Sequence, residues 1–280
     1  GEIPLVIIDV QRLGPSTGSA TKGADSDIEF LRWGNSGGLP VIVMAPADAA
    51  DCYNLTFRAF NLAEIYRCPV FIASNKEIGM TKESVPISFL QGEDRKTRRS
   101  ADPASDAIFR PFQASRSSMV PPFLPIGGKR LVRQTSSSHG PDGYITNVAD
   151  TLEDGIRRMR NKLTDNRDEL SLYHLDEDTR ADTLIITYGV TARAARDSLR
   201  HLRDTQHRVT LLVLKTLFPV PEKLLKMQIC RVSRVVVVEM NLGQYIREIE
   251  RFSGTHNIEF FGKMNGELIS PEEIYRVVAS

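Results

Sequence analysis

The stretch PLVIIDVQRLGPSTG, residues 4–18, combines an apolar run, one arginine and a loop rich in turn-forming residues. Leu5–Ile8 and Val10 are aliphatic and mostly β-branched, which predicts a strand buried on both faces of a parallel sheet. Open α/β sheets bind ligands beyond the carboxyl ends of their strands. Arg12 is expected at that edge, where its guanidinium could hold a small anion. From spacing alone, an ordinary solvated arginine explains this position equally well.

The rest of residues 1–78 alternates strand and helix signals. Pro40–Met44 and Pro69–Ala73 are predicted strands, with a helix over Asp51–Tyr66 between them. One face of that helix is apolar at helical spacing: Leu55, Ala59, Leu62, Ala63 and Tyr66. This pattern indicates part of a βαβ domain. Because its first strand is expected to be buried, we expect sequence outside these residues to supply the amino-terminal part of the domain.

Residues 79–180 have a different composition, rich in proline, serine, arginine and glycine. Long irregular segments are usually functional or disordered. Apolar residues along this one favour an ordered excursion over a partner's surface: Ile87, Phe89, Leu90, Phe109, Phe112, Phe123, Leu124, Ile126, Leu131 and Val132. A helix is predicted from about Val148 to Lys162. The basic clusters at 95–99 and 157–160 are more typical of solvated faces than of a site for an acidic partner.

Residues 181–280 show the clearest domain pattern. Four apolar runs predict buried strands: Thr183–Tyr188, Val209–Leu214, Val235–Glu239 and Ile258–Phe261. Helices are predicted between them: Thr191–Asp204, Pro221–Ile229 and Gly243–Phe252. Strands that alternate with helices indicate a doubly wound parallel sheet. The chain is therefore expected to have an α/β fold with domains at 1–78 and 181–280, joined by the long irregular segment 79–180.

Composition and cysteine spacing argue against several classes of partner and cofactor. The 280 residues carry a net charge of +1, which gives no support to a nucleic-acid or membrane-surface partner. No apolar stretch approaches the ~20 residues that span a bilayer, and no leader pattern is present, so a cytoplasmic location is expected. Cys52, Cys68 and Cys230 are widely spaced and form no C-x-x-C pair. Neither a metal site nor an iron–sulfur cluster is expected in this chain.

Three stretches together resemble a known family: QRLGPSTG (11–18), LPVIVMAPADAADCYNLTFRAFNLAEIYRCPVFIAS (39–74) and VVVVEMNLGQYIREI (235–249). They are similar to the alpha subunits of 2-oxoacid:ferredoxin oxidoreductases, and look closest to the 2-oxoglutarate type. The resemblance implies two doubly wound parallel-sheet domains. The first is a partial pyrimidine-binding-type domain of thiamine enzymes, and the second is similar to the carboxy-terminal domain of transketolase.

The resemblance also implies an activity. Family members decarboxylate a 2-oxoacid on thiamine diphosphate, pass electrons to ferredoxin and transfer the acyl group to coenzyme A. The beta subunit binds the diphosphate with Mg²⁺ and carries the iron–sulfur cluster, while the alpha subunit supplies part of the substrate pocket. Arg12 is the expected catalytic residue. It is expected to bind substrate together with Ser16 and Thr17, and with His139 and Asp142 from a loop of the H-x-x-x-G type.

Two family features are absent from these residues: a Y-P-I-T-P loop and a glutamate that hydrogen-bonds the aminopyrimidine of the cofactor. By resemblance, the chain alone is expected neither to hold thiamine diphosphate nor to turn over, and its cofactor-binding residues are unknown. The expected partners are the beta subunit and the remaining alpha-subunit region, or another chain that supplies that region. Ferredoxin is an indirect partner.

Two other functions stay open. One is a non-catalytic assembly subunit, which would keep the fold but not the substrate site; the retained Arg12 and GPSTG argue against it. The other is the beta chain of a thiamine-dependent 2-oxoacid dehydrogenase, which passes its acyl group to a lipoyl arm. The motif QRLGPSTG argues against that second function.

Overall fold

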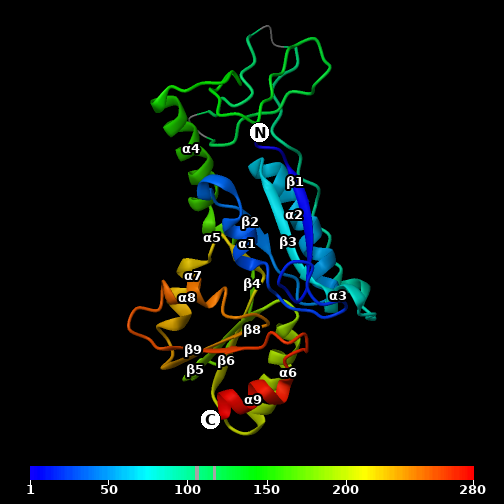
Figure 1. The fold of residues 1–280 in the computed structure, drawn as a ribbon, viewed down its shortest axis with the longest axis vertical. Coiled ribbons are helices and arrows are strands. Elements are labelled where there is room, and N and C mark those ends of the chain that lie inside the picture. The colour runs from blue at the N-terminus through cyan, green and yellow to red at the C-terminus, as the bar shows by residue number, and fades with distance from the viewer. Residues whose placement is uncertain (105–106, 116–117) are drawn as a thin grey trace.

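The structure, a computed structural model, describes residues 1–104, 107–115 and 118–280. Figure 1 shows three regions stacked along the long axis. An irregular region lies at one end together with helix α4 (Ala149–Thr164), one sheet occupies the middle, and a second sheet forms the other end. The fold class expected from the sequence is thus confirmed: an α/β protein with two sheets in which parallel pairing dominates.

The first sheet has the strand order β1-β3-β2-β7. Its strands are β1 (Leu5–Gln11), β2 (Ile42–Met44), β3 (Pro69–Asn75) and β7 (Thr216–Phe218). β1 and β2 both pair in parallel with β3, whereas β7 pairs antiparallel with β2. The predicted crossover helix is α2 (Ala49–Tyr66), and all five of its expected apolar residues are buried. Sequence reasoning missed β7, which brings the later part of the chain into this sheet.

The prediction that the first strand is buried on both faces is wrong. β1 is an edge strand and, among the described residues, pairs with β3 alone. Its aliphatic side chains are exposed on both faces: Leu5 on one face is 50% exposed, and Ile8 on the other is 58% exposed. A β-branched run indicates a strand, but only the chain path decides whether a neighbour covers it.

The second sheet has the order β4-β6-β5-β8-β9. Its strands are β4 (Tyr173–Asp176), β5 (Thr183–Tyr188), β6 (Val209–Leu214), β8 (Arg234–Glu239) and β9 (Ile258–Gly262). All neighbours are parallel except β4, which runs antiparallel to β6. The four predicted strands are confirmed, and β4 is an edge strand that the sequence pattern did not show.

Helices cover both faces of the second sheet. α6 (Thr191–Asp204) and α9 (Pro271–Ala279) pack on one face through a core that includes Leu199 and Ile274. α7 (Glu222–Ile229) and α8 (Ile246–Glu250) pack on the other through Leu225 and Ile249. The sheet is therefore doubly wound, as predicted. The core beneath α7 and α8 is continuous with Ile28 and residues of the first sheet, so apolar packing joins the two sheets.

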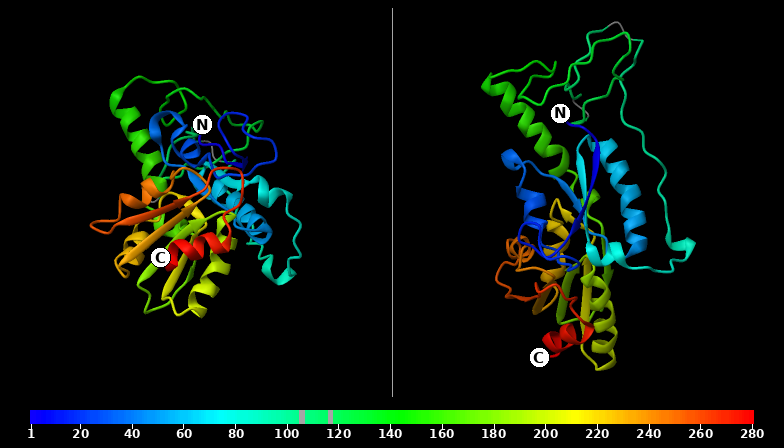
Figure 2. Two further views of the ribbon diagram at one scale, coloured as in Figure 1. Left: turned by 60° about the horizontal axis from the view of Figure 1, so that its bottom comes forward. Right: turned by 45° about the vertical axis from the view of Figure 1, so that its right-hand side comes forward.

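The irregular region contains few regular elements. Short helices precede it, α1 (Ile28–Trp33), η1 (Ser36–Gly38) and α3 (Lys76–Met80); η2 (Ile87–Phe89) and then α4 and α5 (Arg167–Leu170) lie within it. In Figure 2 the segment after α3 runs along the outside of α2 before it reaches this region.

Arg67 anchors the irregular region to the first sheet. Its guanidinium is buried and donates hydrogen bonds to the carbonyl oxygens of Pro111 (2.9 Å) and Pro121 (3.1 Å), and it lies over the Phe123 ring. Such charge-assisted bonds order a segment that has almost no secondary structure of its own. No helix in the described ranges combines the length and apolarity needed to cross a membrane.

Candidate functional site

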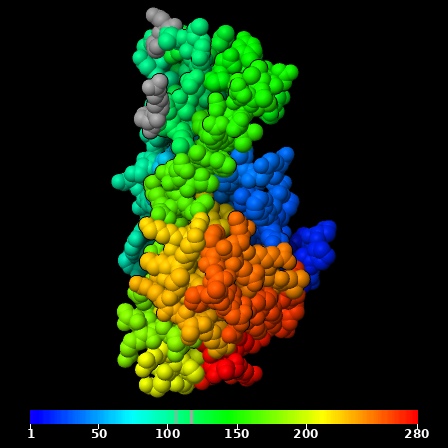
Figure 3. Space-filling view, turned by 90° about the vertical axis from the view of Figure 1, so that its left-hand side faces the viewer, coloured from blue at the N-terminus to red at the C-terminus, as the bar shows by residue number. Residues whose placement is uncertain are grey.

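The loop that follows β1 is closed on itself by backbone hydrogen bonds. The Leu13 N–H donates to the Lys22 carbonyl and the Ser19 N–H to the Leu13 carbonyl, both at 2.9 Å. Gly18 has a φ of +68°, and a Cβ there would lie 1.9 Å from the Leu13 oxygen, so only glycine fits. The dark blue atoms that project from the middle of the molecule in Figure 3 belong to this loop.

Arg12 lies at the base of the loop, directly after the carboxyl end of β1. Its side chain is exposed, and no hydrogen bond or ion pair of its guanidinium occurs within the described residues. Its backbone is fixed, because the Ser26 hydroxyl donates to the Arg12 carbonyl at 2.6 Å. Ser16 and Thr17 are exposed on the same loop. The structure thus places all three predicted residues, exposed, on one loop at the carboxyl end of β1.

Gln11, the last residue of β1, connects this loop to the first sheet. Its side-chain amide donates to the Ser74 carbonyl of β3 at 3.2 Å, and its Oε1 accepts from the Asp27 N–H at 2.9 Å. Gln11 is 2% exposed. A buried amide with both ends bonded fixes the two chain segments that flank the loop.

The VVEMNLGQ segment at the end of β8 holds the same loop from the second sheet. The Asp25 N–H donates to the Met240 carbonyl, and the Asn241 side chain donates to the Asp25 carbonyl, each at 2.9 Å. Gln244 donates to the Ser26 carbonyl at 2.6 Å. VVEMNLGQ thus contacts residues 25–26, and Ser26 in turn holds the Arg12 carbonyl of QRLGPSTG, more than 200 residues away in the sequence.

A buried network lies beneath this contact. The Tyr188 hydroxyl accepts from Asn241 and donates to the Glu239 carboxylate, both at 2.8 Å. Glu239 also accepts the N–H groups of Tyr245 (2.9 Å) and Ile246 (2.8 Å). Burial raises the pKa of Glu239, although these hydrogen bonds oppose the shift. Because it accepts three hydrogen bonds, Glu239 is the better placed of the buried carboxyl groups here to carry charge.

Asp25 is the second buried carboxyl group, and sequence reasoning missed it. Its Oδ1 accepts from the Asn75 amide at 3.0 Å, while its Oδ2 is buried without a hydrogen-bond partner in the described structure. Burial, with a smaller contribution from Glu239, raises the pKa of Asp25 to about 7. A polar residue in a turn-rich loop carries no sequence signal of burial, because the covering surface comes from the other sheet.

Replacing Asp25 by Asn should change how stability depends on pH. The folded chain keeps the Asp25 proton up to about pH 7, whereas the unfolded chain releases it near the ordinary aspartate pKa of 3.8. The folded state binds more protons in this window, so its stability falls as pH rises. Relative to Asp25→Asn, the wild type should lose about 2–4 kcal/mol between pH 4 and pH 8. Urea unfolding at a series of pH values measures this, with the exposed Asp204→Asn as control; parallel curves for all three proteins would contradict it.

His139 and Asp142 lie beyond the opposite end of the first sheet from Arg12. The His139 ring packs on Phe112, with 3.8 Å between ring centroids, and Asp142 accepts the Tyr144 N–H at 3.0 Å. Their loop belongs to the irregular region, which packs at the amino ends of β1 and β3. The seven residues of β1 span about 23 Å. The structure therefore does not bring these two residues to Arg12 within one chain, and their substrate role stays a prediction.

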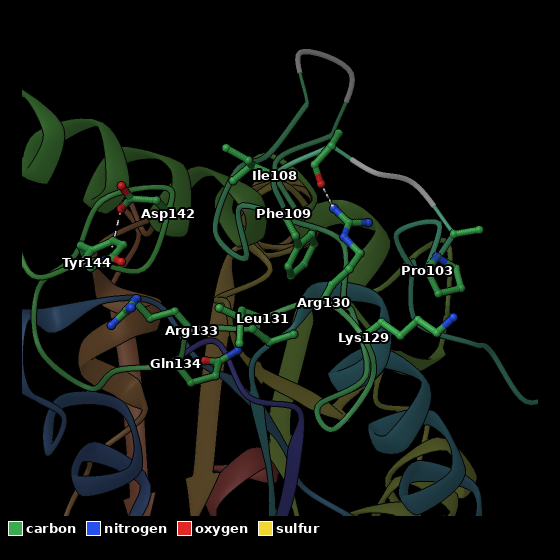
Figure 4. Close-up of a pocket in the computed structure, with 13 residues that line it drawn as sticks. Pro103, Ile108, Phe109, Lys129, Arg130, Leu131, Arg133, Gln134, Asp142 and Tyr144 are labelled. Atoms are coloured by element: carbon green, nitrogen blue, oxygen red, sulfur yellow. Dashed lines mark hydrogen bonds between the residues drawn. The ribbon is translucent and has the colours of Figure 1, made fainter.

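A cavity of about 970 Å³ lies in the irregular region (Figure 4). Its charged and aromatic lining includes Lys129, Arg130 and Tyr144, and Asp142 lies at its rim. Arg130 donates to the carbonyl oxygens of Asp102 and Ala107, so its fork is already engaged. The cavity contains none of the residues of the Arg12 loop.

The described residues contain no group of three or more His, Cys, Asp or Glu side chains that could hold a metal ion. Cys52, Cys68 and Cys230 are free, and burial raises the pKa of Cys68 to about 11. The described residues thus offer no cluster of carboxylate or imidazole side chains that would hold Mg²⁺ together with a diphosphate.

Comparison with solved structures defines the class of fold. The chain matches a split gene transketolase, an inactive beta4 tetramer, with a TM-score of 0.50 and 15% identity over 98% of this chain and 65% of that one, a likeness of fold alone. It matches 2-oxoglutarate:ferredoxin oxidoreductase from Magnetococcus marinus, solved with 2-oxoglutarate, coenzyme A and succinyl-CoA bound, with a TM-score of 0.89 and 26% identity. That match covers 99% of this chain and 48% of the other, so the chain spans about half of that solved chain. The class is a transketolase-like α/β protein.

The family follows from sequence comparison. Residues 1–160 match the family described as "Pyruvate flavodoxin/ferredoxin oxidoreductase, thiamine diP-bdg", and residues 181–274 match "Pyruvate:ferredoxin oxidoreductase core domain II". The chain is 32% identical over 278 residues to 2-oxoglutarate synthase subunit KorA of Methanocaldococcus jannaschii, covering 99% of this chain and 74% of that protein. The chain belongs to the alpha subunits of the 2-oxoacid:ferredoxin oxidoreductases, a family of oxidoreductases, as the resemblance implied.

Proposed function

We propose that the chain is the alpha-subunit portion of an oxidoreductase that decarboxylates 2-oxoglutarate, forms an acyl-CoA and reduces ferredoxin. The bond between the carboxylate and the keto carbon breaks and carbon dioxide leaves. The two electrons of that bond pass to ferredoxin, the acyl group forms a thioester with coenzyme A, and the thiol proton is released to solvent. The choice of 2-oxoglutarate is supported by the names of the M. jannaschii relative and of the M. marinus enzyme.

The observation that carries this proposal is the free guanidinium of Arg12 on a fixed backbone. A 2-oxoacid presents a planar carboxylate, which an arginine binds through two parallel hydrogen bonds. Since the Arg12 carbonyl is held by Ser26, the side chain begins from a defined point at the sheet edge. Fixing the carboxylate orients the keto carbon towards the reacting centre. The exposed hydroxyl groups of Ser16 and Thr17 would add hydrogen bonds.

We assign thiamine diphosphate, with Mg²⁺, and the iron–sulfur cluster mainly to a beta subunit. The match to a thiamine diphosphate-binding family supports the first cofactor. When bound, thiamine diphosphate supplies the carbanion stabilisation that decarboxylation requires. This chain contributes the Arg12 loop at the substrate side.

The test is reduction of ferredoxin or a viologen by the reconstituted complex. A panel of 2-oxoglutarate, pyruvate and a branched-chain 2-oxoacid is assayed with and without coenzyme A. We expect turnover that requires coenzyme A and is greatest with 2-oxoglutarate. A colourless, inactive complex would instead support an assembly subunit, and co-purification of a lipoyl protein would support the dehydrogenase.

The exposed edge of β1 supports a second part of the proposal, a strand of the remaining alpha-subunit region that pairs there. No strand in the part of the chain that the structure describes pairs with this edge, and apolar side chains stand on both faces; the more exposed are Ile3, Leu5, Ile8 and Val10. Such an edge normally requires a cover. A strand from the same enzyme would pair along β1 and bury both faces, as in other parallel sheets.

Replacing Ile8 by Asp should disrupt this pairing. A charge in the middle of an edge strand blocks the addition of a neighbouring strand. We expect a tagged Ile8→Asp chain to lose co-purification of the partner polypeptides that the wild type retains. Met227→Asp, on the exposed face of α7, is the matched control, because Met227 is 46% exposed and far from β1. Equal recovery of partners with both variants would argue against docking at β1.

A further inference from the structure

The position of Arg12 depends on the segment that follows its loop. Arg12 is one residue beyond β1, and its carbonyl is held by the hydroxyl of Ser26. The segment 25–27 thus fixes the backbone from which the guanidinium extends. Any shift of that segment moves the start of the Arg12 side chain.

The second sheet supplies most of what holds this segment. The bonds from Asp25 N–H to the Met240 carbonyl, from Asn241 to the Asp25 carbonyl and from Gln244 to the Ser26 carbonyl all come from the end of β8. Gln244 also accepts the N–H of Glu29 at 3.0 Å, at the start of α1. Residues at the carboxyl end of β8 therefore fix the position of the segment that follows the Arg12 loop.

Asn241 is the central residue of this contact. Its Nδ2 donates to both the Asp25 carbonyl and the Tyr188 hydroxyl, and its Oδ1 accepts from the N–H groups of Gly243 (2.8 Å) and Gln244 (3.0 Å). The side chain is fully buried, so every bond it makes is shielded from water. Tyr188 in turn donates to Glu239, which the Tyr245 and Ile246 N–H groups hold.

The side-chain groups of Asn241, Tyr188 and Glu239 all have hydrogen-bond partners, and a buried network satisfied in this way favours a single arrangement. Moving segment 25–27 would leave the Asp25 carbonyl or the Asn241 amide buried without a hydrogen-bond partner, which is energetically unfavourable. The hydrogen bonds that hold residues 25–26 therefore also hold the Arg12 backbone in place, through Ser26.

We propose that Asn241, supported by Tyr188 and Glu239, is a positioning residue that aligns Arg12 with the substrate carboxylate. This inference rests on the proposed role of Arg12 as the carboxylate-binding residue. Asn241 acts across the two sheets and does not itself touch substrate.

The test is a double-mutant cycle between Asn241→Asp and Arg12→Lys in the reconstituted complex with 2-oxoglutarate. Aspartate keeps the shape and the acceptor of Asn241 but loses both donated bonds. Asn241→Asp alone should raise KM and lower kcat/KM about tenfold to a hundredfold, as expected for a displaced binding group. In the Arg12→Lys background, where the fork is already lost, the same change should lower kcat/KM by less than about threefold. Equal effects in both backgrounds would overturn the inference, as would an unchanged KM.

Two further variants and an amide-exchange measurement separate a positioning role of Asn241 from loss of folding. Tyr188→Phe keeps the bond from Asn241 to Asp25 and should give a smaller rise in KM in the same direction. Asn257→Asp, an exposed change in the same domain, should leave KM unchanged. Amide exchange in the full chain should accelerate at Leu13 and Ser19 in Asn241→Asp only. Wild-type turnover in Arg12→Lys would refute the proposed role of Arg12, and an inactive wild-type complex would refute the proposed function. Unchanged exchange in Asn241→Asp would refute the network's role independently of turnover.

Discussion

The Arg12→Lys variant of the reconstituted enzyme is expected to lose a factor on the order of 10² or more in kcat/KM for its 2-oxoacid. Lysine keeps the charge but has a single ammonium in place of the planar fork, so it cannot hold both carboxylate oxygens in a fixed orientation. The factor corresponds to the few kcal/mol expected for losing a charge-assisted pair. The guanidinium has no other partner in the described part of the chain, so the change should leave stability nearly unaltered.

Steady-state viologen reduction measures this loss, and thermal unfolding checks the fold. Arg276→Lys on α9 is the matched control, because Arg276 is 72% exposed in a surface pair with Glu272. That variant should keep full activity. Wild-type turnover in Arg12→Lys would rule out Arg12 as the residue that binds the substrate carboxylate.

The second large effect is expected at Glu2. Its carboxylate accepts bonds from Arg158 and from Lys162, whose Nζ lies 2.7 Å from Oε2. Lys162 also donates to the Arg67 carbonyl at 3.0 Å, and the side chains of Glu2 and Lys162 are only 4% and 5% exposed. Glu2→Gln leaves a buried lysine without its counter-charge, and the free energy of unfolding should fall by about 3–5 kcal/mol. Urea unfolding of the full chain measures this change.

The pH dependence has a definite sign. Burial alone would raise the pKa of Glu2, but the bonds from Arg158 and Lys162 outweigh it and lower that pKa to about 2. Glu2 therefore stabilises the fold fully above its ordinary pKa of 4.5, and this contribution is lost as pH falls from there towards 2. The effect should be absent from Glu2→Gln.

Controls distinguish the buried pair from surface charge. Glu153→Gln breaks an exposed pair with Arg157 and should leave the free energy of unfolding nearly unchanged, because solvent screens that pair. The double variant Glu2→Gln, Lys162→Met removes both buried charges and should recover part of the loss. If Glu2→Gln and Glu153→Gln lowered the free energy of unfolding by the same small amount, the buried pair of Glu2 and Lys162 would not be what joins α4 to the first sheet.

Much of the secondary structure could be predicted, because its signals are local. Thr183–Tyr188 and Val209–Leu214 are strands with the predicted bounds, and Thr191–Asp204 is a helix with the predicted bounds. Long apolar or amphipathic runs identify such elements whatever surrounds them. The predicted helix Gly243–Phe252 is shorter, Ile246–Glu250, since the Asn241 side chain caps the turn at Gly243 and Gln244 instead.

The domain limits drawn at residues 78 and 180 stay predictions. β7 shows why a boundary read from composition is incomplete: Thr216–Phe218 follows β6 of the second sheet and yet pairs with β2 of the first. The candidate site shows a similar limit. Both motifs, QRLGPSTG and VVEMNLGQ, are visible in the sequence, but the sequence does not show that Asn241 holds Asp25 and that Ser26 holds Arg12.

The sequence by itself determined the α/β class, most strands and helices, and the family. These depend on local patterns of apolar residues and on the residues of short motifs. Only the tertiary structure decided that β1 is an exposed edge, that Asp25 is buried, and that His139 lies far from Arg12. The physical reason is that burial and hydrogen bonding of a residue depend on which distant segment packs against it. Leu5–Gln11 has the same apolar pattern whether a neighbouring strand covers it or not.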